Sequence, residues 1–148
     1  MSTILGVRYR VRWVRCLVAL GVSNATVGAL LGLMYWLYSF GFDWGSIADS
    51  GNGEAVWSSV LASAVFGLLV PTGLSLLSLV PQPRSPRSWP MRVAVGPAAC
   101  SLLSFIFVWY FPAVLAFVAL AAVGGGALSI LAVRLVNGVR TEADCEPY

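Results

Sequence analysis

The side chains that could do chemistry are few in this chain, and their spacing does not favour catalysis. Its cysteines, Cys16, Cys100 and Cys145, have neither the paired spacing of a disulfide framework nor the spacing of a metal site. The chain contains no histidine, so histidine cannot ligate a haem and no serine has a histidine partner for nucleophilic attack. We therefore expect no enzyme activity, no cofactor and no bound metal.

Three of the six carboxylates lie in one short segment that is rich in glycine, serine and asparagine. Asp43, Asp49 and Glu54 lie there without any basic residue. Carboxylate oxygens bind Ca²⁺, but these residues lack the alternating spacing of a calcium-binding loop. The segment 43–56 is therefore predicted to be a solvated external loop.

The elements that carry these residues are predicted from composition. The chain of 148 residues is 59% apolar and only 10% charged, with a mean hydropathy of +0.85. Its apolar residues form uncharged stretches of about 20 residues, which is the length that crosses a hydrocarbon core as a helix. The sequence predicts one all-α, integral membrane domain over residues 1–148, with spans at about 16–40, 57–80, 91–110 and 112–136.

A proline-rich linker at 81–90 divides these spans into two helical hairpins. Four prolines between Pro81 and Pro90 oppose helix formation, and Arg84, Arg87 and Arg92 lie in or next to the linker. Arginine beside membrane spans favours the cytoplasmic side. We expect a four-helix bundle with the N-terminus, the linker and the C-terminal tail (137–148) all cytoplasmic, in a bacterial cytoplasmic membrane.

The arginines have a second possible role as contacts for anionic lipid headgroups, each contributing about 1 kcal/mol near a charged surface. The candidates are Arg8, Arg10, Arg12, Arg15, Arg84 and Arg87. We favour the simpler interpretation that these charges set the orientation. The net charge of +3 is dispersed at the ends of spans, so we expect no nucleic-acid partner.

Small residues mark one side of the first span. Gly21, Ala25, Gly28 and Gly32 recur at helical spacing, with Asn24 beside them. This side suits close helix packing, either against the protein's own helices, which we favour, or against a second copy.

The later spans contain helix-disrupting residues. Pro71 predicts a bend, and Thr72, Gly73 and Ser75 can help satisfy the carbonyl that it frees. The triplet Gly124, Gly125 and Gly126 predicts either very close helix contact, which we favour, or a local break that lines a site.

The residues within the predicted spans bear on which classes of membrane carrier this chain resembles. No Asp, Glu, Lys or Arg lies deep in a predicted span, which disfavours proton-coupled carriers. Small multidrug carriers are similar in size, but they depend on an acidic residue in the first span, where this chain has Asn24. In length and hydropathy, with Arg15 before the first span and Arg92 before the third, the chain resembles the small four-span translocases of polyprenyl-linked sugars, which implies a flippase.

Three functions are compatible with this pattern. Our first prediction is a non-catalytic subunit that contacts membrane lipids and either another integral membrane protein or itself. The alternative is a small carrier or flippase for a lipid-linked or neutral solute. A holin-like pore former is the third.

Overall fold

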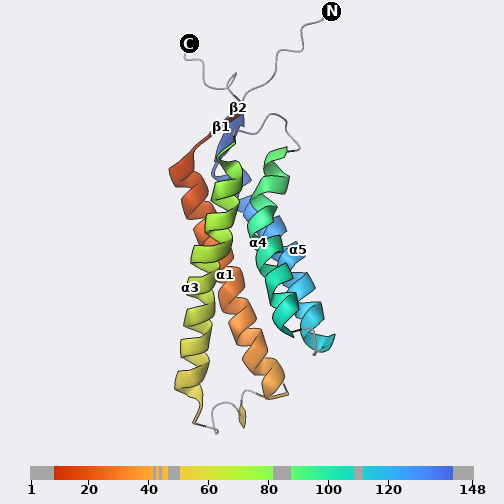
Figure 1. Cartoon of the computed structure of the whole chain (residues 1–148). Coiled ribbons are helices and arrows are strands. Elements are labelled where there is room, and N and C mark those ends of the chain that lie inside the picture. The colour runs from red at the N-terminus through yellow and green to blue at the C-terminus, as the bar shows by residue number, and fades with distance from the viewer. Residues whose placement is uncertain are drawn as a thin grey trace, which may run out of the picture.

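Four helices lie side by side in the part of the chain that the computed structural model describes, which is residues 9–41, 43, 45–46, 51–81, 88–108 and 112–141 (Figure 1). They are α1 (Trp13–Ser39), α3 (Gly53–Leu79), α4 (Ser88–Val108) and α5 (Pro112–Leu135). α1 and α3 form one hairpin, and α4 and α5 form the other. The hairpins meet where α3 contacts α4 and where α1 contacts α5.

The helices follow the apolar stretches because a backbone in lipid must satisfy its own hydrogen bonds. Three segments are long and apolar enough to cross a membrane, judged by length and composition: Trp13–Ser39, Gly53–Leu79 and Val118–Leu135. The prediction of a chain with membrane-spanning helices is confirmed to that extent. The side chains of α4 are described only as far as Leu103, so the span at 91–110 stays a prediction.

Three helices begin earlier than the spans that the sequence predicts. α1 begins at Trp13, before the predicted start at about residue 16. α3 begins at Gly53, inside the predicted loop 43–56, and its first turn contains Glu54, where a carboxylate complements the helix dipole. α4 begins at Ser88, inside the predicted linker 81–90. Pro90 lies in the first turn of α4, where its missing N–H breaks no helical hydrogen bond. Residues 82–87 of the linker lie outside the described residues.

Two short strands were not expected in a chain predicted to be all-α. β1 (Tyr9–Val11) pairs antiparallel with β2 (Val139–Thr141), and Arg10 lies opposite Arg140. Asn137, at φ 49°, and Gly138 turn the chain after α5. The N–H of Arg12 donates to the carbonyl of Gly138 at 2.7 Å, so the predicted tail begins in contact with the N-terminal segment.

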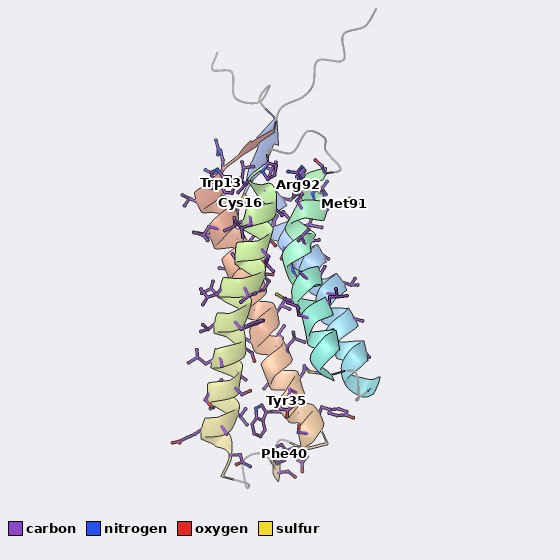
Figure 2. The ribbon with its side chains drawn as sticks, viewed as in Figure 1. Trp13, Cys16, Tyr35, Phe40, Met91 and Arg92 are labelled. Carbon is purple, nitrogen blue, oxygen red and sulfur yellow. The ribbon has the colours of Figure 1, made fainter. Side chains whose placement is uncertain are left out.

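The buried core is concentrated at the end of the helices that carries this two-stranded ribbon. Figure 2 places Cys16 and Arg92 at that end and Tyr35 and Phe40 at the opposite end. The fully packed apolar cluster is Val11, Cys16, Ala19, Leu20, Leu79, Trp89, Val93 and Val133. Large apolar side chains outside this cluster face outward at both ends of the helices, with Val14 75% and Trp57 74% exposed. Lipid suits such a surface better than water does.

Candidate functional site: the cavity between the hairpins

The small-residue side of α1 is occupied by α3. A Cβ built on Gly28 would lie closer than 3.0 Å to the carbonyl oxygen of Ser63, and one on Gly32 would lie 2.9 Å from the Ser63 hydroxyl. A Cβ on Gly67 of α3 would meet the carbonyl of Asn24 in the same way. The two backbones therefore touch, as in packing against the protein's own helices.

The other predicted packing residues of α1 lie along the same contact. Gly21 is buried, and a Cβ there would be 3.0 Å from the Leu68 Cδ1 atom. Ala25 is half-buried. The groove of α1 is thus used inside the chain along most of its length.

Within the described chain, two of the three consecutive glycines of α5 contact α4, and the third does not. A Cβ on Gly125 would lie 3.4 Å from Pro97, and one on Gly126 would lie 3.5 Å from Ala94, both ordinary contacts with α4. A Cβ on Gly124 would meet no described atom within 4 Å. α5 runs unbroken through all three residues, so the alternative of a local helix break does not match this helix.

Asn24 is the centre of a buried polar cluster that links α1, α3 and α5. Its Nδ2 donates to the Thr72 hydroxyl at 3.1 Å, and its Oδ1 accepts from the Ser129 hydroxyl at 3.1 Å. The Ser129 hydroxyl also lies 3.3 Å from that of Ser23. Asn24, Thr72 and Ser129 are at most 3% exposed. Such a cluster fixes the three helices because unpaired polar groups are costly in an apolar interior.

Each interior proline frees a carbonyl, and a hydroxyl of α3 satisfies it. Pro71 lacks the N–H that would bond the Gly67 carbonyl, and the Thr72 hydroxyl lies 3.5 Å from that oxygen. Pro97 of α4 frees the Val93 carbonyl in the same way, and the Ser75 hydroxyl donates to it at 2.7 Å. The sequence predicted that both Thr72 and Ser75 could help at the carbonyl freed by Pro71, but Ser75 donates to the carbonyl freed by Pro97 in α4.

A cavity of about 470 Å³ lies between the two hairpins, with residues of all four helices in its lining. Asn24, Ser63, Cys100 and Ser101 contribute polar atoms. The volume falls within the range of ligand pockets in proteins.

The rest of the cavity wall is apolar or formed by small residues. Val27, Leu31, Phe66 and Val118 supply apolar surface, and Pro71 of α3 and Pro97 of α4 also line the cavity. No acidic or basic side chain is among the described residues that line it. The cavity therefore suits an uncharged ligand with a large apolar part, because an ion would lose its hydration there without a counter-charge.

Neither end of the helices adds a reactive centre within the described chain. No group of three or more His, Cys, Asp or Glu residues there could hold a metal ion. Asp43 accepts hydrogen bonds from the Ser46 hydroxyl at 2.6 Å and the Gly45 N–H at 2.9 Å, which hold the pKa of its carboxyl below the ordinary value. This is a solvated turn. Asp49 lies outside the described residues.

The arginines considered for lipid contact lie at the ribbon end where they are described. Arg10 is in β1, Arg12 follows it, and Arg15 donates from Nη1 to the carbonyl of Val136 at 3.2 Å. Arg8, Arg84 and Arg87 lie outside the described residues.

The sequence did not predict the cavity. Phe66 and Ser101, which line it, belong to no recognisable motif, and only the relative placement of the hairpins brings them together. Comparison with known protein families, characterised proteins and solved structures gives no match for this chain. The cavity is therefore interpreted from its own chemistry.

Proposed function

We propose that this protein is a non-catalytic carrier for an uncharged amphiphile, a lipid-linked or neutral solute that binds in the cavity between the two hairpins. The observation that supports this proposal is the cavity of about 470 Å³ with its neutral lining. Ligand pockets typically combine apolar walls with a few polar groups that orient the ligand. Asn24, Ser63 and Ser101 would bind the polar part, and Val27, Phe66 and Val118 would contact the apolar part.

The carrier would act without ion coupling. Ion-coupled carriers generally place charged or histidine side chains at membrane depth, and the predicted spans contain no Asp, Glu, Lys, Arg or His in their interiors. The ligand would therefore move down its own concentration gradient between the leaflets, as a flippase or facilitator permits.

The proposed setting is a four-span bundle in a bacterial cytoplasmic membrane, with both termini in the cytoplasm. Arg12, Arg15 and Arg92 lie toward the ribbon end, whereas Asp43 and Glu54 lie at the other end of the helices, which matches the positive-inside rule. A membrane-impermeant maleimide should label Ser46→Cys in intact cells and Thr141→Cys only after permeabilisation. The reverse pattern would contradict this orientation.

A second candidate is the non-catalytic subunit of a membrane assembly, bound to another integral membrane protein or to a second copy. The groove of α1 no longer supports it, because α3 fills that groove. Gly124 supports this second candidate. A glycine inside a helix costs about 0.5–1 kcal/mol relative to alanine, and no described neighbour requires a glycine at this position. A contact on that face of α5 would give this glycine a role. No described feature favours the pore former over these two.

The carrier proposal is tested by reconstitution into phosphatidylcholine vesicles that contain an NBD-labelled glucosyl diacylglycerol. Dithionite quenches the probe in the outer leaflet only, so quenching beyond the protein-free level reports transfer between leaflets. The wild type should raise this quenching. Ala121→Phe, which fills the cavity, should abolish the increase.

The matched control is Ala119→Phe, which adds the same ring on the same helix at an exposed position outside the cavity lining. It should retain wild-type transfer. Equal transfer by both variants, or none by the wild type, would count against the carrier.

A further inference from the structure

We propose that the contact between α3 and α4 is a hinge, on which the α4/α5 hairpin swings to open and close the cavity. This inference rests on the carrier function for its purpose, but the hinge can be measured without any ligand. Three features of that contact support it: a proline inside each helix, an exchangeable hydrogen bond and uneven packing.

The two interior prolines lie at the same level of the contact. Pro71 and Pro97 interrupt the backbone hydrogen bonds of α3 and α4 respectively, and prolines inside helices are where kinks form. Gly96, next to Pro97, lies so close to the carbonyl of Pro71 that a Cβ on it would come nearer than 3.0 Å. The positions at which a proline weakens each helix therefore lie next to each other.

The Ser78 hydroxyl of α3 can exchange partners across this contact. The Ser78 hydroxyl has one proton and two acceptors, the Arg92 carbonyl of α4 at 2.5 Å and the Ser75 carbonyl of its own helix at 2.7 Å. A hydroxyl can thus give up a bond between helices and keep one within its own helix. Movement then leaves that donor satisfied, which removes the main cost of breaking a buried hydrogen bond.

Packing differs on the two sides of this point. Toward the ribbon, Leu79 and Val93 are fully buried and Trp89 is 8% exposed. Toward the other end lies the cavity, which residues of both hairpins line. A swing about Pro71 and Pro97 would therefore change the width of the cavity and leave the packed end in place.

Distances between spin labels, introduced through non-natural amino acids so that the native cysteines stay in place, test the hinge in nanodiscs. One pair replaces Leu61 of α3 and Leu120 of α5, on the cavity side of the prolines. The other replaces Val14 of α1 and Leu135 of α5, at the packed end. All four side chains are at least 67% exposed, so the labels project away from the helix contacts. We expect two distances for the first pair and one for the second.

Pro97→Ala restores the N–H that can bond the Val93 carbonyl, so the minor distance of the first pair should fall about tenfold or disappear. Pro90→Ala is the matched control, because Pro90 lies in the first turn of α4 and interrupts no hydrogen bond. A single distance for the first pair in the wild type, or equal effects of the two variants, would overturn the hinge. Two distances without transfer of the NBD probe would leave the hinge standing and contradict the carrier.

Discussion

Individual glycines decide how closely the helices approach each other. Gly28 of α1 lies against the carbonyl of Ser63, whereas Gly124 of α5 has open space where a Cβ would be. The same substitution should therefore have opposite effects at the two positions.

Gly28→Ala should lower the free energy of unfolding by about 1–3 kcal/mol, the usual cost of overpacking. Gly124→Ala should leave it unchanged or raise it by about 0.5–1 kcal/mol, because alanine is the better helix former. Equilibrium unfolding in mixed micelles measures both. Equal losses at the two sites would show that the open face of α5 is covered, and no loss at Gly28 would contradict the described α1–α3 contact.

Because the Ser75 hydroxyl donates to the carbonyl freed by Pro97, the effects of Ser75→Ala and Pro97→Ala should depend on each other. Ser75→Ala leaves the buried Val93 carbonyl without its donor, and should cost about 1–3 kcal/mol of unfolding free energy. In a Pro97→Ala background, the new backbone N–H supplies that donor, so Ser75→Ala should cost much less.

The coupling is read from a double-mutant cycle in the same unfolding assay. Ser58→Ala is the control, since the exposed Ser58 hydroxyl bonds only the Ala55 carbonyl of its own helix among the described contacts. Additive effects of Ser75→Ala and Pro97→Ala would refute the compensation.

At this scale the sequence predicted which residues pack, but not always against what. The spacing of Gly21, Gly28 and Gly32 places them on one side of a helix whatever their partner is. Separating Gly124 from Gly125 requires the rotation of α5 about its axis, and pairing Ser75 with Val93 requires the register of two helices. The hydropathy of the sequence predicts neither the rotation of α5 nor the register of α3 against α4.

Among the elements, hydropathy located the helices well because each apolar stretch must be helical in lipid. The ribbon of β1 and β2 was missed for an equally clear reason. Strands of three residues show no periodic pattern, and their partners lie at opposite ends of the chain. Their pairing follows from the way α1 and α5 bring the two segments together.

The register of the ribbon can be checked by cross-linking. Tyr9 and Thr141 are directly opposite, at a separation that a disulfide can bridge. Tyr9→Cys with Thr141→Cys should therefore form a disulfide rapidly upon mild oxidation of the full chain, with Cys145 replaced by serine.

Tyr9→Cys with Val139→Cys is the control, because that pair is diagonal and about 7–8 Å apart. It should react far more slowly, as measured by peptide mass spectrometry. Comparable yields from the two pairs would mean that the strands are not in this register.

At the scale of the whole molecule, tight packing at one end and a cavity between the hairpins are the features that suggest function. Neither could be predicted from the sequence, since both depend on the angle between two hairpins whose outward faces are similarly apolar. The sequence did limit the chemistry. The chain has no histidine, and no Asp, Glu, Lys or Arg lies deep in a predicted span. A site between the helices would therefore bind neutral molecules.

The most direct test of the central claim is native mass spectrometry of the full chain, released from nanodiscs made with native membrane lipids. The wild type should carry one tightly held, uncharged amphiphile per chain, and Ala119→Phe should carry the same mass. Ala121→Phe, with its ring in the cavity, should lack it. An adduct that persists unchanged in Ala121→Phe, or a wild type without any adduct, would contradict the assignment of the cavity as a ligand site.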